Sequence, residues 1–164
     1  HTGTHIDAPY HFIEDGNRIE KIQIEDFIGE CIVIEVDTED YIKKEHIENI
    51  ELDNHTKILF KTKNSELWEK NTKEFQKSFI SLEQSAVDYL IEKCIKLIGI
   101  DYLSIETFYS MDASVHKSVL GNDIIILEGL NLHNVIPKEY ELICMPMKLI
   151  GCDGAPARVI LKDL

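Results

Sequence analysis

The segment from residue 57 to residue 100 constrains the fold most, because it contains a strand signal, a helix signal and a second strand signal in succession. Residues 57–61 (KILFK) and 95–100 (IKLIGI) are short apolar runs, which is typical of buried strands. Residues 81–93 repeat apolar side chains at helical spacing, so that one face carries Leu82, Ala86, Leu90 and Ile91. This order predicts two parallel strands joined by a crossover helix.

The rest of the chain supplies further strands and short helices. Ser81 followed by Gln84 matches a capping box, which predicts that the helix begins at Ser81. Further strands are predicted at residues 29–37, 124–127, 140–150 and 158–164. The remaining predicted elements are a short helix over 114–120, a short helix or turn within 41–54, and a loop with a helical turn over 64–76. About six strands and two or three helices predict an α/β fold with a mixed central sheet.

Length and charge narrow the class of protein. A chain of 164 residues predicts one domain, spanning residues 1–164. The 17 basic and 30 acidic residues give a net charge of −13, which argues against a nucleic-acid backbone or an anionic membrane surface as partner. No apolar run approaches the roughly 20 residues of a membrane-spanning helix.

The cysteines indicate a reducing compartment. None of the four belongs to a C-x-x-C pair, and four cysteines in a chain of this size do not form a disulfide scaffold. We expect a cytoplasmic protein in which Cys31, Cys94 and Cys144 are buried as small apolar side chains. The chain begins at His1 without a Met, which predicts that an N-terminal segment is missing.

The first twelve residues, HTGTHIDAPYHF, hold three histidines and one aspartate. Several unpaired imidazoles repel one another when protonated, and a divalent metal ion removes this problem by binding the neutral ring nitrogen. An accidental histidine-rich terminus or an affinity tag is the alternative. A tag is a run of identical residues, whereas these histidines are interleaved with Gly, Thr, Asp and Pro. The stretch therefore indicates a metal site.

Spacing indicates which of these side chains meet. In an extended stretch, residues two positions apart share a face, so His5 and Asp7 can point the same way. Gly3 disfavours a regular helix, although a turn at Gly3 can aim His1 and His5 at one point. His11 lies four positions beyond Asp7. It is close enough to the site to act as a proton carrier rather than a ligand.

The pattern H-x-G-T-H-x-D-x-P-x-H-F, matched over these twelve residues, resembles the signature of the cyclase family of metal-dependent hydrolases. That family includes bacterial kynurenine formamidase and isatin hydrolase. The resemblance implies that His1, His5 and Asp7 are metal ligands and that His11 is the catalytic acid/base. The run GCDGAPAR at residues 151–158 also looks like a family segment, so the resemblance covers most of the chain.

The resemblance also implies a second pair of ligands, a histidine and a glutamate twelve positions apart, which here are His116 and Glu128. The local sequence agrees for Glu128, because it directly follows the apolar run IIIL. Burying such a carboxylate without a partner costs several kcal/mol, and metal coordination is one way to offset this cost. The alternatives are an ion pair with Lys or Arg for Glu128 and an ordinary helix position for His116.

By resemblance, we expect a metal-dependent amidohydrolase that uses one or two ions of Zn²⁺, with Mn²⁺ as the other candidate. The implied substrate is a small aryl amide, first of all N-formylkynurenine, whose hydrolysis belongs to tryptophan breakdown. A cyclic amide such as isatin is the alternative substrate. A metal-binding module without catalytic activity is the alternative function.

The resemblance further implies the swivelling β/β/α fold of the family and assembly as a homodimer or homotetramer. The N-terminal strands of the family are missing from this chain, which predicts an unpaired edge of the sheet. The aromatic residues Trp68, Tyr10 and Phe12 could form a wall for a planar substrate. Packing in the core is the alternative role for these three side chains.

Overall fold

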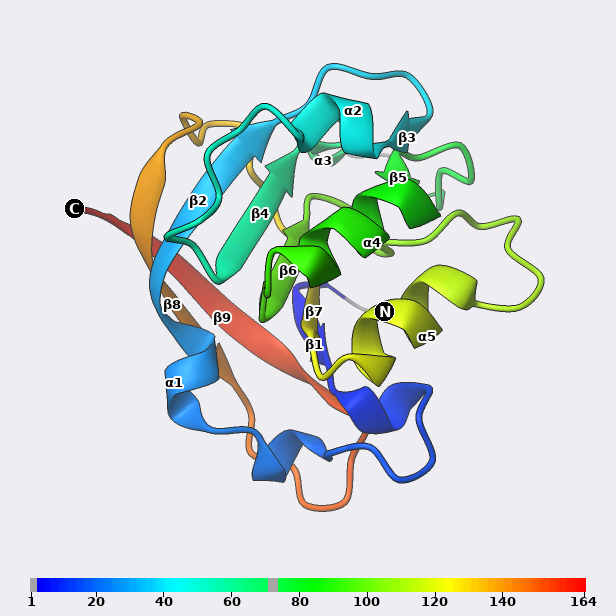
Figure 1. Ribbon diagram of the computed structural model, residues 1–164, viewed down its shortest axis with the longest axis vertical. Coiled ribbons are helices and arrows are strands. Elements are labelled where there is room, and N and C mark those ends of the chain that lie inside the picture. The colour runs from blue at the N-terminus through cyan, green and yellow to red at the C-terminus, as the bar shows by residue number, and fades with distance from the viewer. Residues whose placement is uncertain (1–2, 71–73) are drawn as a thin grey trace.

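A seven-stranded sheet that closes on itself forms the centre of the molecule (Figure 1). The structure is a computed structural model that describes residues 3–70 and 74–164. Around this barrel the strands follow the order β1-β7-β6-β4-β2-β8-β9, and β9 returns to β1. Their bounds are β1 His5–Asp7, β2 Ile28–Glu35, β4 Lys57–Lys61, β6 Leu97–Ile100, β7 Ile125–Glu128, β8 Glu139–Pro146 and β9 Gly154–Asp163. A separate two-stranded sheet pairs β3 (Tyr41–Ile42) with β5 (Ser81–Leu82).

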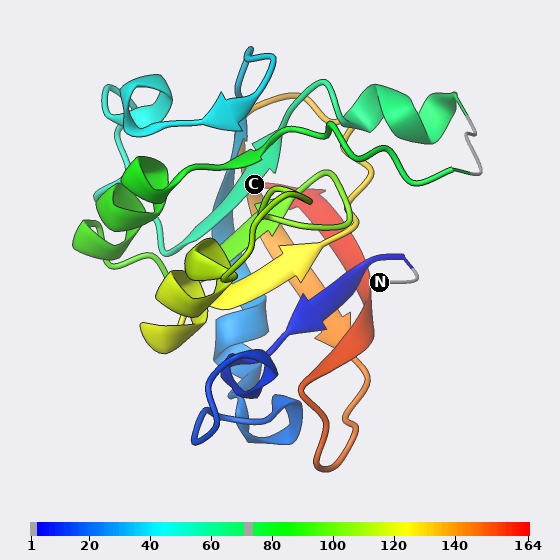
Figure 2. The same cartoon turned by 90° about the vertical axis from the view of Figure 1, so that its right-hand side faces the viewer.

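The barrel combines parallel and antiparallel pairs. Strands β2, β4, β6 and β7 form a parallel block, and β8 and β9 continue it in antiparallel fashion. Strand β1 lies between β7 and β9 and is antiparallel to both (Figure 2). The predicted mixed sheet is confirmed, and so is the parallel pairing of β4 with β6. The expected unpaired edge is wrong for the barrel, because β1 is paired on both sides.

The two longest described helices, α4 (Gln84–Glu92) and α5 (Ser114–Gly121), pack on one side of the barrel, outside β6 and β7 (Figure 1). The other helical elements are single turns, namely η1 Pro9–His11, η2 Ile19–Lys21, α1 Ile24–Phe27, α2 Lys44–Ile47 and α3 Ser65–Glu69. None of the helices in the described part of the chain is both long enough and apolar enough to cross a bilayer.

The predicted capping box is wrong. Helix α4 begins at Gln84 after Glu83, and no side chain caps it. Ser81 is instead fully buried in β5, where it pairs with Tyr41 of β3. Ser81 is therefore part of a strand, although the local sequence predicts that it begins the helix.

Apolar residues alternate along the central strands and so fill two separate cores. In β4, Leu59 belongs to the core inside the barrel, whereas Ile58 and Phe60 belong to the core beneath the helices. In β7, Leu127 points inward and Ile126 points to the helices. Each such buried side chain stabilises the fold by roughly 1.5–3 kcal/mol. Both faces of the parallel strands are covered, which explains why they are continuous apolar runs in the sequence.

Candidate metal centre

The candidate centre lies on the outer face of the barrel where β1 meets β7. Ile6 is fully buried in the core inside the barrel, so its neighbours His5 and Asp7 point to the opposite face. The antiparallel register places Glu128 directly opposite His5, on the same face. The extended spacing thus brings His5 and Asp7 together as predicted, and the register adds Glu128.

The donor atoms of these three side chains converge. His5 Nε2 lies 3.3 Å from Glu128 Oε2 and 3.7 Å from Asp7 Oδ1. One donor atom from each of the three residues lies within 4.8 Å of the other two. An imidazole nitrogen with two carboxylates is a mixed nitrogen and oxygen donor set, which suits Zn²⁺ and Mn²⁺. The residues present therefore fit a divalent metal ion.

His116 joins this cluster from the first turns of α5. Its Nε2 lies 3.3 Å from Glu128 Oε1, so the two oxygens of Glu128 face two different histidines. Glu128 is fully buried, and its Oε1 also accepts a hydrogen bond of 2.8 Å from the backbone N–H of Ile105. Among the residues that the structure describes, Glu128 thus contacts two imidazoles and a backbone N–H, whereas the alternative interpretation expected Lys or Arg.

All three described histidines of the cluster are held in the same way. Each has its Nδ1 beside an oxygen atom and its Nε2 directed toward a carboxylate of the centre. The Nδ1 contacts are His5 to Gly3 O at 2.8 Å, His116 to Glu106 Oε2 at 2.6 Å and His11 to Asp153 Oδ2 at 2.7 Å. A hydrogen bond at Nδ1 fixes the ring and so keeps Nε2 directed toward the carboxylates of the centre.

The carboxylates of the centre favour positive charge. Burial by itself lowers the pKa of His116, but hydrogen bonds and charges from Glu106 and Glu128 outweigh it and raise the pKa to about 9. Burial by itself also lowers the pKa of His5, but the hydrogen bond with Glu128 and the charge of Asp7 outweigh this effect. The pKa of His5 is therefore raised as well. The same field that holds a proton on these rings would favour a divalent cation.

His11 lies at the open side of the centre, on the single turn η1. Its Nε2 is 4.0 Å from Asp7 Oδ2, and its side chain is partly exposed. The hydrogen bond from His11 lowers the pKa of Asp153. A cavity of about 220 Å³ adjoins these side chains and His5. His11 is therefore placed to exchange protons with a molecule in this cavity.

The sequence did not reveal two of the residues in this cluster. Glu106 and Asp153 hold the rings of His116 and His11, and both lie in loops. Glu106 precedes its histidine by 10 positions, whereas Asp153 lies 142 positions from His11. The only signal was that Asp153 belongs to the run at 151–158, to which no role was assigned. His1, the remaining predicted ligand, lies outside the described residues.

A pocket of about 780 Å³ opens beside His116. Four phenylalanines are among its lining residues, namely Phe12, Phe75, Phe79 and Phe108. The ring of Phe12 lies 5.0 Å from that of His116, so the aromatic wall reaches the candidate centre. Of the three aromatic residues considered for such a wall, only Phe12 lines this pocket. The other two have different contacts, since Trp68 donates to the carbonyl of Asp101 and Tyr10 lies beneath Arg18.

Comparison with known proteins places the chain in a family. The Cyclase family model matches residues 1–107. A protein named kynurenine formamidase from Bacillus mycoides (strain KBAB4) is 32% identical over 164 residues, which cover 100% of this chain and 77% of that protein. The chain therefore belongs to the cyclase family.

Two solved structures extend the comparison. One is described as a potential metal-dependent hydrolase with cyclase activity; it is 38% identical, has a TM-score of 0.89, and is matched over 98% of this chain and 77% of that chain. Isatin hydrolase A from Ralstonia solanacearum has a TM-score of 0.80 at 22% identity, over 97% of this chain and 70% of that chain, and so shares the fold. The predicted relationship to metal-dependent hydrolases is confirmed.

Proposed function

We propose that the protein is a metal-dependent amidohydrolase that cleaves the C–N bond of a small aryl formamide, first of all N-formylkynurenine. The observation that carries this proposal is the convergence of His5, Asp7 and Glu128 beside an aromatic pocket. The relatives named kynurenine formamidase support the substrate class. We also propose a small-molecule substrate as the main partner and a cytoplasmic location.

The residues that would hold the metal are His5, Asp7, Glu128 and His116, with His1 added by resemblance. When bound, a divalent ion supplies Lewis acidity, which polarises a carbonyl group and lets water ionise near neutral pH. Zn²⁺ is the first candidate and Mn²⁺ is the second, and we propose one or two ions for each chain. The two oxygens of Glu128, each facing a different histidine, favour two ions.

His11 is the proposed acid/base. Its Nε2 would accept the proton of the attacking water and return it to the leaving nitrogen, while Asp153 holds Nδ1. The leaving group then departs as a neutral amine. The phenylalanines beside His116 would bind the aryl ring by stacking and edge contacts.

A cyclic aryl amide such as isatin is the second candidate, because it would use the same ring pocket and the same proton transfer. The test is hydrolysis of N-formylkynurenine, isatin and an aryl ester by the chain loaded with Zn²⁺ or Mn²⁺. We expect the formamide to be cleaved fastest and a chelator to abolish turnover. Metal binding without turnover of any of these compounds would favour the non-catalytic module instead. A homodimer or homotetramer is the proposed assembly, and light scattering after gel filtration tests it.

A further inference from the structure

Glu106 makes more hydrogen bonds than an ordinary loop carboxylate. It lies between β6 and α5 and is only 4% exposed. Its Oε1 accepts from Ser110 Oγ at 2.6 Å and from the backbone N–H of Val115 at 3.2 Å. Its Oε2 accepts from the backbone N–H of His116 at 3.1 Å and lies 2.6 Å from His116 Nδ1. Both oxygens are therefore fully used.

These contacts give Glu106 two tasks at once. Helix α5 has Ala113 at its N-cap, in the left-handed region at φ 53°, and no side chain of that residue caps it. The N–H groups of the first turn are satisfied from the preceding loop, because Asp112 accepts from Ser114 while Glu106 accepts from the next two residues. The same carboxylate that caps the helix also holds the ring of His116.

We propose that Glu106 is the positioning residue of the metal centre, and that it fixes the His116 ring so that Nε2 faces Glu128. This inference rests on the proposed function, since it takes His116 as a ligand. With Nδ1 held, rotation of the ring is blocked and the 3.3 Å approach of Nε2 to Glu128 Oε1 is retained. Glu106 thereby makes the helix start and the ligand one rigid unit.

The negative charge is part of this role. Both carboxylate oxygens of Glu106 accept hydrogen bonds from donors. A glutamine at this position would place its amide N–H₂ group, itself a donor, against the donors that face one of these oxygens. A glutamine oriented with its oxygen toward His116 still accepts from Nδ1 but loses the bond from Val115. We therefore expect Glu106→Ala to disturb the position of the His116 ring more than Glu106→Gln does. Both should disturb it more than a substitution in the same loop that keeps the contact at His116 Nδ1.

The test is the affinity of the chain for Zn²⁺, measured by competition with a chromophoric chelator at constant pH. Removing such a partner of a metal ligand weakens binding about 10- to 100-fold. We expect Glu106→Ala to lie in this range and Glu106→Gln to lose less. Asp112→Ala is the matched control, because it removes another cap of α5 without touching His116. Asp112→Ala should lower the melting temperature and change the Zn²⁺ affinity of the parent chain by no more than about twofold. That change is smaller than the roughly 10-fold minimum loss expected for Glu106→Ala.

A double-mutant cycle separates positioning from general destabilisation. In the His116→Ala background, Glu106→Ala should cause no further loss of Zn²⁺ affinity. An undiminished loss in that background, or an equal loss in Asp112→Ala, would overturn the proposal. A parent chain that fails to bind Zn²⁺ would overturn the proposed metal centre and this inference together, whereas normal binding that Glu106→Ala leaves unchanged would overturn this inference alone.

Discussion

His5 and Glu128 are register partners across the antiparallel pair of β1 and β7, and their side chains meet at 3.3 Å between Nε2 and Oε2. Strand pairing itself, rather than a loop, sets this distance. A slip of one residue would turn Glu128 to the inside of the barrel and place an apolar neighbour at the centre. The candidate site therefore depends on the hydrogen-bonding register of the barrel.

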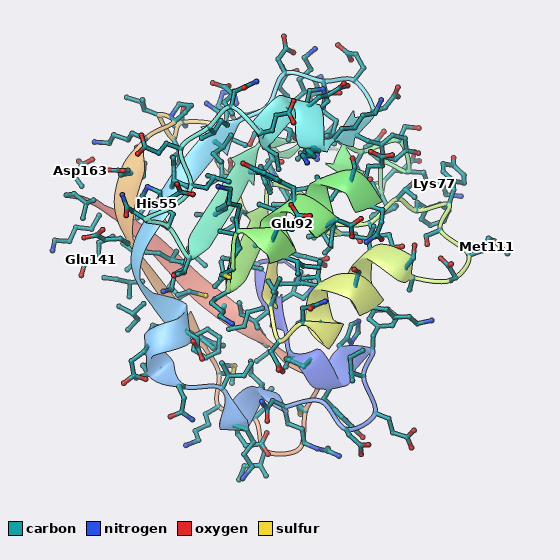
Figure 3. The ribbon with its side chains drawn as sticks, viewed as in Figure 1. His55, Lys77, Glu92, Met111, Glu141 and Asp163 are labelled. Carbon is teal, nitrogen blue, oxygen red and sulfur yellow. The ribbon has the colours of Figure 1, made fainter. Side chains whose placement is uncertain are left out.

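Replacing Glu128 by Gln should weaken metal binding strongly. The carboxylate faces His5 and His116 at once, and a neutral amide keeps its shape while losing its charge. We expect at least a 10-fold loss of Zn²⁺ affinity, measured by chelator competition. The matched control is Glu141→Gln on β8, whose carboxylate is paired with Lys162 far from the centre (Figure 3). Equal affinities in the two variants would contradict the assignment of Glu128.

Replacing Asp153 by Asn should slow turnover without removing metal. Asp153 holds Nδ1 of His11 at 2.7 Å, and an amide can present a donor to this nitrogen and turn the ring. We expect kcat to fall roughly 10- to 100-fold with KM and metal content nearly unchanged. Asp163→Asn at the far end of β9 serves as the control, since its carboxylate pairs with Lys138. A large change in metal content in Asp153→Asn would argue against separate roles for the ligands and His11.

Phe108 should contribute to recognition of the aryl ring. It is half exposed on the rim of the pocket, 5.7 Å from the ring of Phe75 and beneath the ammonium of Lys77. Figure 3 shows Lys77 and Met111 on this same side of the molecule. Phe108→Ala should raise KM for formanilide about threefold to tenfold, because an aromatic pair contributes roughly 0.5–1.5 kcal/mol.

The control for this prediction separates the pocket from its surroundings. Tyr109 follows Phe108 and is exposed, but it does not line the pocket. Because the Tyr109 ring packs edge-on against Phe108 at 5.5 Å, Tyr109→Ala should raise KM for formanilide less than Phe108→Ala does. Turnover of an aliphatic formamide should be equally insensitive to both changes, because it has no ring to stack. A parallel loss for the aromatic and the aliphatic substrate would show that Phe108 acts on the fold instead.

The thiols should divide into reactive and protected groups. Burial raises the pKa of Cys31 and of Cys144 to about 12, whereas Cys94 is exposed and Cys152 partly so. At pH 8 the two buried thiols carry about a thousandfold less thiolate than free cysteine. Iodoacetamide should label Cys94 first, and the buried pair only after unfolding, as mass spectrometry of the peptides would show.

The same two buried thiols make the free energy of unfolding depend on pH. In the unfolded chain each buried thiol ionises near its ordinary pKa of 9, and in the fold near 12. The folded state keeps its proton over this window while the unfolded state loses it, so the free energy of unfolding should fall as the pH rises from 9 toward 12. Urea titrations at several alkaline pH values measure this fall. A Cys31→Ala variant with an unchanged slope would contradict the contribution of this thiol.

Gly129 should resist substitution because of its backbone. It follows Glu128 with φ +73°, and a Cβ there would lie 2.5 Å from the carbonyl oxygen of Gly3. Gly129→Ala must strain the left-handed backbone and push the start of β1 away from β7. We expect a loss of about 1–3 kcal/mol in the free energy of unfolding, measured in urea. Gly121→Ala is the control, because its Cβ would meet only an ordinary contact with Ile13.

The sequence predicted those parts of the fold that depend on local pattern. The run at 57–61 became β4 without change, and the helix at 114–120 became α5 with one residue added. The prediction for Cys94 was wrong, because apolar neighbours do not reveal the face on which a residue lies. Cys94 follows the end of α4 at φ 58°, and this turn directs it to solvent.

The candidate site was predictable only where spacing or resemblance supplied the pairing. Two positions of extended chain sufficed for His5 and Asp7, and a spacing of twelve with the family resemblance suggested His116 and Glu128. Which oxygen holds each ring could not be predicted, because the contact of His11 with Asp153 spans 142 positions. Such contacts follow from how the barrel closes, and single-sequence patterns do not encode that closure.

The closure of the barrel also fixes the order in which the site can be made. Strand β1 is only three residues long, and it is held between β7 and β9, which are among the last strands of the chain. During synthesis, His5 and Asp7 emerge before Gly154, the register partner of Asp7, so both neighbours of β1 exist only after β9 has been made. A ribosome-bound chain that stops before β9 should therefore lack the assembled cluster, because β1 pairs with β9.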